Sequence, residues 1–577
     1  MWKIISTCLL LAVHAAGQVC PIPGPLYPAP RAAAGSTTLD RASNEFMASL
    51  KSVMHPDYYS SREPAIDPDL VSFTVQVYSA HESRPLFEHY HTATSARNNT
   101  IGVDSVDEDT VFRIASCSKL WTVLLLLMET GDASFHEPIV KYVPELQEAI
   151  AERRSNNTDF RNEVDQVLWE EVTIGELASQ LSGVGRQYGI GDLAGSADIM
   201  VPLGFPELSE SEAPRCAVDP TCTISLIEFI SGILNRPPIV PTSSNPAYSN
   251  DAYQLLAYAL ETITGTTYQE LMESHLIEPM GLSRSSVIKP DDKVGIIPGF
   301  PNMTLWDLDI GDVTPAGGLY SSTKDMSRLG RAILNHELLS PALTRRWLKP
   351  FAQTSELGSL VGAPFEIFSL THPRMITLYT KAGDIGGYSA MMGLSPDHDV
   401  GFTILAAGEG TTLAVMTLAD LISKFLIPAL DEAAKREAHN SFAGTYSSAA
   451  TNSSLEVTTD DGPGLRVIKW TNNGKDILDA LPLIQLGPPG QGVELRLFPT
   501  GLKHGGRLSF RSVRPSGFGT GPSCGPITRA CRSWMLVDGS MYGALGVDEF
   551  VFETGEDGRA ISASPRAMRV ALAREYE

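Results

Sequence analysis

The sequence is poor in positive charge and in cysteine. Its 577 residues include 44 Lys and Arg against 67 Asp and Glu, which gives a net charge of −23. Such an acidic chain repels phosphate backbones and anionic lipid headgroups, so we expect no nucleic-acid partner and no membrane partner. With 43% hydrophobic and 19% charged residues, the composition is typical of a folded globular protein rather than a disordered or fibrous one.

Two common cofactor signatures are also missing. The zinc-binding pattern His-Glu-x-x-His does not occur, and the 12 His residues are scattered along the chain. Gly-x-Gly-x-x-Gly does not occur between a strand pattern and a helix pattern, which disfavours a dinucleotide enzyme. We therefore expect neither a metal site nor an organic cofactor.

Residues 1–17 are typical of a secretory signal peptide. Lys3 supplies the positive charge, Leu9 to Val13 form the apolar centre, and Ala15 to Gly17 are small residues suited to cleavage. The apolar segment is too short to cross a bilayer, which takes about 20 helical residues. A buried N-terminal helix is the alternative. We expect a secreted, extracellular protein.

The cysteines and the glycosylation sequons are compatible with an extracellular protein. Seven cysteines become six when Cys8 leaves with the signal peptide. Two pairs that are close in sequence predict local disulfides, Cys216 with Cys222 and Cys524 with Cys531, while Cys20 and Cys117 stay unassigned. Sequons of the form Asn-x-Ser/Thr predict glycosylation at Asn98, Asn156, Asn302 and Asn452.

Periodicity divides the remaining chain into three parts. Residues 18–64 are predicted to be an extended leader, because their first half is rich in Pro and Ala. Residues 65–438 mix helix and strand patterns, and helical patterns dominate from 139 to about 370. Residues 439–577 hold short alternating runs between Gly-rich turns, which predict an all-β barrel or sandwich. The mixed part contains predicted strands at 71–78, 86–90, 375–380 and 400–407 and predicted helices at 120–128, 251–264 and 324–335.

One segment combines a nucleophile with a base one helical turn away. Ser116 and Lys119 lie three residues apart at the predicted start of the buried helix, so their side chains share a helix face. Lysine takes the serine proton when burial or a neighbouring cation lowers its pKa. The helix N-terminus also favours negative charge on the attacking oxygen.

The same pattern also occurs away from Ser116. Ser321 and Lys324 match the same Ser-x-x-Lys template, and Lys-x-Gly occurs at Lys293, Lys381 and Lys503. Tyr-x-Asn, by contrast, occurs once, at Tyr248. The order of the motifs and their surroundings therefore have to decide which copies belong together. They favour the succession Ser116-x-x-Lys119, Tyr248-x-Asn250 and Lys381-x-Gly383.

On these three motifs, residues 65 to 435 resemble the serine β-lactamase and penicillin-binding-protein superfamily. The Tyr-x-Asn form is similar to that of class C β-lactamases, D-peptidases and related esterases. With the trailing β domain, the chain resembles secreted β-lactamase-like proteins of filamentous fungi. The resemblance implies an α/β (α+β) β-lactamase/transpeptidase-like fold, in which an antiparallel sheet is flanked by helices and accompanied by an all-helical subdomain.

The resemblance also indicates which copies of the repeated patterns have a structural or surface role. Ser321 and Lys324 fall in the stretch Pro315 to Ser322, which in the family starts a structural helix, so Ser321 is expected to be its N-cap. Lys293 and Lys503 are expected to be surface charges.

The resemblance implies a role for each selected residue. Ser116 would be acylated, and Lys119 and Tyr248 would share the general-base task as a coupled pair that the sequence does not divide. Asn250 would hold Lys119 or a substrate amide, and Lys381 would supply positive charge near the phenolate and toward a substrate carboxylate. The N–H groups of Ser116 and Asp384, beside Gly383, would form the oxyanion hole.

Two departures from the family pattern bear on the substrate. Asp384 stands where β-lactamases have Ser or Ala, and its carboxylate would repel an anionic substrate. Ala382 lacks the hydroxyl that helps to bind the carboxylate of penicillin-like compounds. Both disfavour antibiotic hydrolysis and leave ester, amide or lactone hydrolysis open. Cys117 is expected to be a small buried residue rather than a second nucleophile.

Three functions remain open at this point. The first is a secreted serine hydrolase acting on a small-molecule acyl substrate through an acyl-enzyme. The second is an acyltransferase or transesterase of natural-product biosynthesis, which shares the acylation step. The third is a catalytically silent binding protein on the same scaffold. Neither the substrate nor the oligomeric state follows from the sequence.

Overall fold

The computed structural model divides the chain into two compact units. One comprises residues 42–426, and the other comprises residues 1–41 together with 427–577. The structure describes residues 21–54, 66–97, 101–156, 162–209, 212–218, 224–299, 301–371, 374–484, 494–513, 530 and 533–576.

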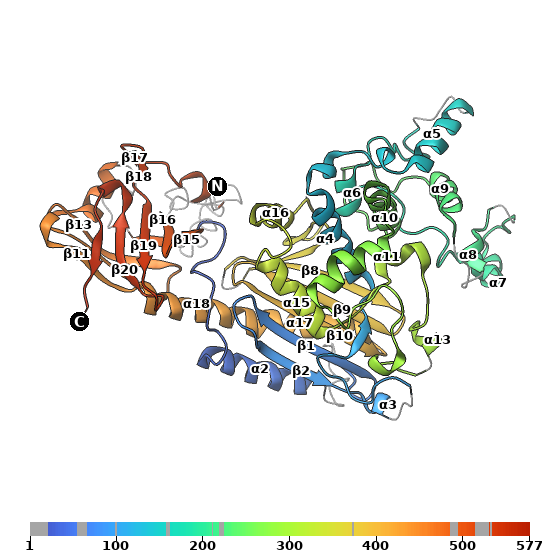
Figure 1. The fold of residues 1–577 in the computed structure, drawn as a ribbon, viewed down its shortest axis with the longest axis horizontal. Coiled ribbons are helices and arrows are strands. Elements are labelled where there is room, and N and C mark those ends of the chain that lie inside the picture. The colour runs from blue at the N-terminus through green and yellow to red at the C-terminus, as the bar shows by residue number, and fades with distance from the viewer. Residues whose placement is uncertain are drawn as a thin grey trace, which may run out of the picture. The chain divides into compact units, whose positions relative to one another are not determined.

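The larger unit is built on an eight-stranded antiparallel sheet, with the order β2-β1-β10-β9-β8-β7-β6-β5. The helices α15 and α17 lie along its strands, where they contact β1, β9 and β10 (Figure 1). The strands are β1 Val71–Ser79, β2 Pro85–His91, β5 Ala352–Gln353, β6 Ser359–Val361, β7 Glu366–Leu370, β8 Ile376–Ile385, β9 Tyr388–Ser395 and β10 Val400–Gly408. A separate two-stranded ladder joins β3 (Val111–Arg113) to β4 (Tyr320–Ser322).

The predicted strands of this unit are confirmed at 71–78, 86–90, 375–380 and 400–407, each within about two residues at most ends. The strands β5, β6 and β7 were not predicted, because helical patterns were expected as far as residue 370. They are short strands of two, three and five residues, and at that length a period of two cannot be distinguished from an irregular loop.

The longer helices in the described chain are α2 Thr37–Val53, α4 Ser118–Thr130, α5 Pro144–Asn156, α9 Leu226–Leu234, α10 Asp251–Thr264, α15 Thr323–Leu334, α17 Thr411–Leu421 and α18 Ile427–Phe442. Shorter ones are α3 Thr94–Arg97, α6 Ile174–Ala178, α7 Ala197–Met200, α8 Arg215–Val218, α11 Tyr268–Leu271, α12 Glu278–Met280, α13 Pro301–Thr304, α14 Thr314–Gly317 and α16 Pro341–Trp347. The prediction of α10 is confirmed at both ends, and those of α4 and α15 within about three residues.

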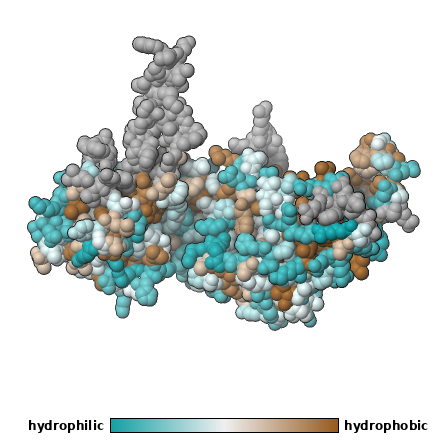
Figure 2. Space-filling view, turned by 90° about the horizontal axis from the view of Figure 1, so that it is seen from above, coloured by the Kyte–Doolittle hydropathy of each residue, from teal (hydrophilic) through white to brown (hydrophobic). Residues whose placement is uncertain are grey.

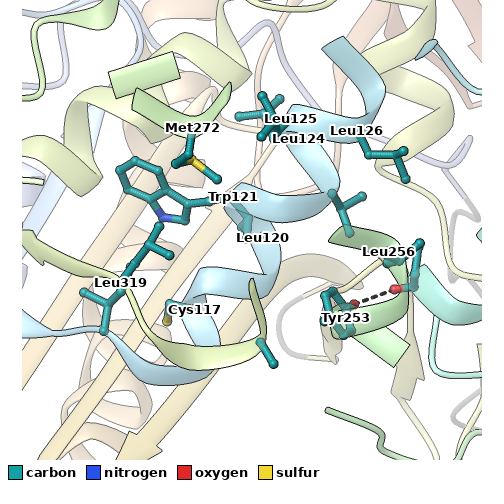
Figure 3. Close-up of a cluster of buried hydrophobic side chains, with 14 of the residues drawn as sticks. Cys117, Leu120, Trp121, Leu124, Leu125, Leu126, Tyr253, Leu256, Met272 and Leu319 are labelled. Carbon is teal, nitrogen blue, oxygen red and sulfur yellow. Dashed lines mark hydrogen bonds between the residues drawn. The ribbon is translucent and has the colours of Figure 1, made fainter. Parts of the chain in front are cut away.

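Helix α4 is the central helix of the larger unit, as its uninterrupted apolar sequence predicts. All residues from Ser118 to Leu127 are buried, and α10 and α14 pack against the helix. Figure 3 shows Trp121 of α4 beside Met272, while Tyr253 and Leu256 of α10 lie across the cluster. A helix apolar on all sides must be enclosed on all sides, which fixes its first turn within the domain.

The C-terminal unit is a β-barrel. Its nine-stranded sheet has the order β12-β11-β21-β20-β19-β16-β15-β13-β14, and an additional pairing of β12 with β13 closes the ring. The strands are β11 Gly444–Ser448, β12 Ser453–Thr458, β13 Leu465–Asn472, β14 Lys475–Asp476, β15 Leu495–His504, β16 Arg507–Val513, β19 Glu549–Thr554, β20 Ala560–Pro565 and β21 Leu572–Arg574, with a small ladder of β17 Met541–Tyr542 and β18 Leu545–Gly546 beside them.

Two predicted boundaries differ from the structure. The expected extended leader contains α2, because the residues from Thr37 onward are helix-compatible and bury Phe46 and Leu50, an amphipathic pattern that the Pro-rich start of the leader obscures. The division between the units falls before α18, whereas 438 was predicted. The reason is that α18 packs Ala434, Ala438 and Phe442 into the core of the C-terminal unit.

By length and composition, one helix among the described residues would suffice to cross a membrane. It runs continuously over Thr411–Phe442, and 56% of its most apolar window is buried in the protein. The face shown in Figure 2 is mainly hydrophilic, with separate apolar patches. A single helix of this kind is weak evidence for a membrane span, and the absence of a membrane partner stays a prediction.

Candidate active site

Ser116 lies in a 3₁₀ turn, Ala115–Cys117, that leads directly into α4 and packs against β8. It thus lies just before the α-helix rather than in its first turn. Ala115 has a φ of 45°, a left-handed conformation that costs a residue with a side chain about 1–3 kcal/mol. Ser118 stabilises this turn, because its Oγ donates to Ala115 O at 2.7 Å and accepts from Leu319 N at 3.1 Å.

Ser116 Oγ is the centre of a hydrogen-bond network. It accepts from Tyr248 OH at 2.7 Å and from Lys119 Nζ at 3.1 Å. Lys119 Nζ also donates to Asn250 Oδ1 at 2.7 Å and to Ala316 O at 2.6 Å. Two motifs that lie far apart in the sequence therefore meet at one oxygen, and Asn250 holds Lys119 as expected.

Lys119 has the environment of a proton acceptor rather than of a surface ammonium. Its side chain is fully buried, and its Nζ lies 4.9 Å from the centroid of the Tyr248 ring. Burial, and then the neighbouring Lys381 ammonium, hold the pKa of Lys119 well below its usual value, while the Glu366 carboxylate opposes this shift. A lysine with a lowered pKa is available as a neutral amine at a pH where an exposed lysine is charged.

The Tyr248–Asn250 turn is positioned by residues 180–188. Ser249 N donates to Gln180 Oε1 at 2.6 Å, and Asn250 N donates to Arg186 O at 2.7 Å. Sequence reasoning missed Arg186, although its guanidinium carbon lies 5.0 Å from the centroid of the Tyr248 ring. It also missed Gln187, whose Oε1 accepts from Asn250 Nδ2 at 2.8 Å. Neither residue belongs to a motif, so only contact reveals them.

The buried side chain of Asp251 holds the segment of residues 180–188 in place. Asp251 Oδ1 accepts from Tyr188 N at 3.0 Å, and its Oδ2 lies 3.5 Å from Arg236 Nη1. Arg236 also donates to Gln187 O at 2.5 Å. Burial raises the pKa of Asp251 to about 6, against the opposing effects of the Tyr188 N–H and of Arg236. These contacts fix the loop that carries Arg186 and Gln187.

Lys381 projects from β8 toward the same network. Its Nζ lies 5.4 Å from the centroid of the Tyr248 ring, as the expected role near the phenolate requires. It is paired with a residue that the sequence analysis missed, since Glu366 Oε1 lies 2.5 Å from Lys381 Nζ. Burial lowers the pKa of Lys381, but the Glu366 carboxylate and Tyr248 outweigh it and raise the pKa above its usual value.

Gly383 and Asp384 face opposite sides of the sheet, as successive residues of a strand do. A Cβ added to Gly383 would lie 2.5 Å from Ser116 N, so only glycine lets the turn that contains Ser116 approach β8 this closely. Asp384 instead turns toward β9 and α17, where its Oδ1 accepts from Ser389 Oγ of β9 and Thr412 Oγ1 of α17, both at 2.6 Å. The carboxylate that faces the motif lysine is therefore Glu366 and not Asp384.

Cys117 is a buried structural residue, as expected. Its Sγ donates to Lys381 O at 3.0 Å and it is a free cysteine. Burial raises the pKa of the thiol to about 12, although the Lys381 ammonium opposes this shift. A thiol with so high a pKa is not a nucleophile near neutral pH.

The repeated patterns lie elsewhere. Lys293 and Lys503 are exposed, as expected of surface charges. Ser321 belongs to β4, and the N-cap of α15 is Ser322, whose side chain accepts from Asp325 N. The expected N-cap was therefore one residue early, because the β3–β4 pairing extends through both serines.

The remaining predicted sites are only partly described. Cys222, Cys524, Cys531 and Asn98 lie outside the described residues, as do residues 1–17 and Cys20. Cys216 is buried in α8, Asn156 ends α5, Asn302 lies in α13, and Asn452 is exposed in a left-handed turn before β12. Disulfides and glycans stay predictions. Within the described ranges, no group of three or more His, Cys, Asp or Glu side chains is arranged to hold a metal ion.

Comparison with known proteins agrees with the two-unit division. The Beta-lactamase family model matches residues 72–425, and a model described as Beta-lactamase-like-like, C-terminal domain, matches residues 434–576. A "Beta-lactamase-like protein" of Arthroderma benhamiae is 28% identical over 574 residues, covering 92% of each chain. A "Probable hydrolase M10" of a Phoma species is 26% identical, covering 85% of this chain and 79% of the relative.

Among solved structures, a class C beta lactamase from Rhodobacter sphaeroides is similar at 17% identity with a TM-score of 0.46, covering 67% of this chain and all of that one. The family match and the antiparallel sheet with its flanking helices confirm the expected β-lactamase/transpeptidase-like fold. The closed ring of β12 and β13 makes the C-terminal domain a barrel, one of the two forms that were expected.

Proposed function

Because this chain belongs to the beta-lactamase family, we propose that it is a serine hydrolase that cleaves an ester, amide or lactam bond through an acyl-enzyme on Ser116. The observation that carries this proposal is the convergence of two motifs on one oxygen. Tyr248 OH and Lys119 Nζ lie 2.7 Å and 3.1 Å from Ser116 Oγ, within the reach that a general base needs.

Acylation would begin with transfer of the Ser116 hydroxyl proton to the Lys119–Tyr248 pair. The freed oxygen attacks the substrate carbonyl carbon, and the carbonyl oxygen becomes an anion. The backbone N–H of Ser116, and that of Asp384 one residue beyond Gly383, are the proposed donors to this anion. The anion then collapses, the bond to the leaving group breaks, and the pair returns its proton to that group.

Deacylation would run the same steps with water as the nucleophile. The Lys119–Tyr248 pair accepts a proton from water, hydroxide adds to the acyl carbon, and Ser116 leaves with its proton restored. If an alcohol or amine takes the place of water, the acyl group is transferred instead of hydrolysed. Hydrolysis and transfer therefore differ only in the acceptor.

The test is a trapping experiment with a matched control. The protein is mixed with p-nitrophenyl acetate, the initial burst of p-nitrophenol is recorded, and the intact mass is measured after acid quenching. We expect an acetyl adduct on the Ser116 peptide, lost in Ser116→Ala and kept in Ser321→Ala. An adduct that persists in Ser116→Ala would contradict the proposal, and a folded protein without burst or adduct would favour the silent binding protein.

A second arm decides between hydrolysis and transfer. Ethanol or an amine is added during turnover, and the ratio of free acid to ester or amide product is measured. Hydrolase activity predicts acetate as the main product with a weak dependence on the acceptor. Dominant transfer at low acceptor concentration would assign the protein to the acyltransferases of this scaffold.

We also propose that the protein is secreted and glycosylated. Lys3 and the apolar run after it support export, and the exposed position of Asn452 supports attachment of a glycan there. Expression with eukaryotic secretion, N-terminal sequencing and glycosidase treatment test this proposal. A secreted protein that begins after residue 17 and loses mass with glycosidase is expected, and an intracellular protein of full length would contradict it.

A further inference from the structure

An anion-binding pair beside Ser116 is already filled by the chain's own carboxylate. The Lys381 ammonium and the Ala382 N–H are adjacent donors on β8. Glu366 engages both, since its Oε1 lies 2.5 Å from Lys381 Nζ and its Oε2 accepts from Ala382 N at 3.1 Å. One carboxylate thus takes the two donors that a substrate carboxylate would otherwise use.

The backbone holds Glu366 in this position. It is the first residue of β7 and is opposite Thr380 in the antiparallel register with β8. Thr380 Oγ1 also donates to Glu366 O at 2.6 Å. The carboxylate therefore extends from a paired strand rather than from a free loop, and its placement beside Lys381 is part of the sheet.

The exposures show which member of the pair meets the solvent. The side chain of Lys381 is 1% exposed, whereas that of Glu366 is 36% exposed. An anion that approaches from the solvent meets the carboxylate before the ammonium. The positive charge is compensated at short range, so the pair offers no net attraction to a second carboxylate.

The pair lies close to the reacting groups. Lys381 Nζ is 5.4 Å from the centroid of the Tyr248 ring, and Tyr248 OH is 2.7 Å from Ser116 Oγ. Gly383, two residues beyond Lys381, lies against Ser116 N. A group attached near the scissile bond would reach this edge of β8.

Building on the proposed function, we propose that Glu366 is a specificity residue that occupies the anion position at Lys381 and Ala382. The enzyme then acts on acyl compounds that are uncharged next to the scissile bond and rejects those that carry a carboxylate there. A purely structural role, in which Glu366 only compensates a buried lysine, predicts a loss of stability in variants but no change in the choice between neutral and anionic substrates.

The experiment compares two matched substrate pairs. p-Nitrophenyl butyrate and p-nitrophenyl hemisuccinate differ by a carboxylate on the acyl side. Methyl m-acetoxybenzoate and m-acetoxybenzoate differ by one on the leaving-group side. kcat/KM is measured for wild type, Glu366→Gln and Glu356→Gln, where Glu356 is an exposed acid in the turn before β6. Circular dichroism and fluorophosphonate labelling of Ser116 establish that each variant is folded and has a reactive serine.

We expect wild type to prefer the neutral member by about 10-fold in at least one pair, an effect of like charges at close range. Glu366→Gln should reduce that preference by about 5-fold or more, because Lys381 and Ala382 become available to the substrate, and Glu356→Gln should leave it unchanged. Wild type that prefers the anionic member, or a labelled Glu366→Gln with an unchanged ratio, would overturn this proposal alone. Failure of wild type to label at Ser116 would overturn the proposed function and this inference with it.

Discussion

The segments at Ser116 and Ser321 both match the Ser-x-x-Lys template, but the surroundings of their serines and lysines differ. At Ser116 the lysine amine reaches the serine oxygen at 3.1 Å and is fully buried. At Ser321 the serine is in β4, its Oγ lies 2.9 Å from Ser285 Oγ, and Lys324 contacts Asp109 and Glu108 with its side chain 53% exposed. The template alone therefore does not bring the lysine amine to the serine oxygen.

The difference lies in what surrounds each lysine. Lys119 is enclosed within the protein and faces a second ammonium, so its pKa is lowered by burial and by Lys381. Lys324 donates to Asp109 and Glu108, and these hydrogen bonds raise its pKa. One site favours a neutral amine and the other a permanent cation, which is what separates a proton acceptor from a surface charge.

The largest predicted effect is that of replacing the serine in each of the two segments. Ser116→Ala should reduce kcat by about 10⁴-fold or more, because loss of a nucleophile removes the covalent pathway. Ser321→Ala should leave kcat within about 2-fold and cost about 1 kcal/mol of stability through the lost buried hydrogen bond. Steady-state ester hydrolysis and urea unfolding check both. Equal losses of activity in the two variants would contradict the assignment.

Replacing the lysine of each segment should have effects that differ almost as much. Lys119→Met should reduce kcat by about 10²–10⁴-fold, the usual contribution of general-base catalysis. Its stability should be unchanged or higher, because a buried ionisable group is replaced by an apolar one of similar volume. Lys324→Met removes only exposed ion pairs and should change stability by less than about 1 kcal/mol. An active Lys119→Met would assign the base to Tyr248 alone.

A glycine substitution tests the close approach that only the Ser116 site has. Gly383→Ala places a Cβ 2.5 Å from Ser116 N and should reduce kcat by about 10²–10³-fold, since the oxyanion donor must move. The matched control is Gly387→Ala, whose Cβ would have its nearest neighbour at 3.5 Å. Normal turnover in a folded Gly383→Ala would show that the backbone at Ser116 N is not used in this way.

The pH dependence of kcat/KM should also distinguish Lys119 from Lys324. kcat/KM should fall as the pH drops through the apparent pKa of the Lys119–Tyr248 pair, because the base must be unprotonated. Lys381 and Arg186 lower the pKa of Lys119 and Glu366 raises it, so Glu366→Gln should move this acid limb to lower pH. Lys324→Met should not move it. A shift to higher pH in Glu366→Gln would contradict the electrostatic account.

The smallest predicted effect concerns Asp251, the buried acid that contacts the segment of residues 180–188. Folded Asp251 has a pKa of about 6, above the usual 3.8, so its stabilising contribution is fully present below 3.8 and is lost as the pH rises through about 6. Asp251→Asn keeps the acceptor for Tyr188 N without a charge. Near pH 7 it should therefore be about 1–3 kcal/mol more stable than wild type, as measured by urea unfolding. Lower stability there would mean that the ion pair with Arg236 dominates.

The sequence predicted the long helices of the larger unit and the motif residues beside them. α4 and α10 were foreseen because their apolar patterns are long, whereas Ser116, Lys119 and Asn250 were selected by the order of the motifs and the family resemblance. Glu366 was missed because β7 has only five residues, and side-chain alternation over so short a strand carries little signal. Arg186 and Gln187 were missed because their role depends on a loop conformation that hydrogen bonds to the Tyr248 turn create. Contacts between distant segments are what sequence patterns leave undetermined.

The most direct test of the central claim uses both serines in one molecule. The wild-type protein is treated with a limiting amount of a fluorophosphonate, digested, and the modified fractions of the Ser116 and Ser321 peptides are compared. Because both serines experience the same reagent, pH and fold, each is the control for the other. We predict labelling at Ser116 with Ser321 unmodified. Labelling at Ser321, or at both serines equally, would contradict the account that burial and the second ammonium, rather than the Ser-x-x-Lys template, create the nucleophile.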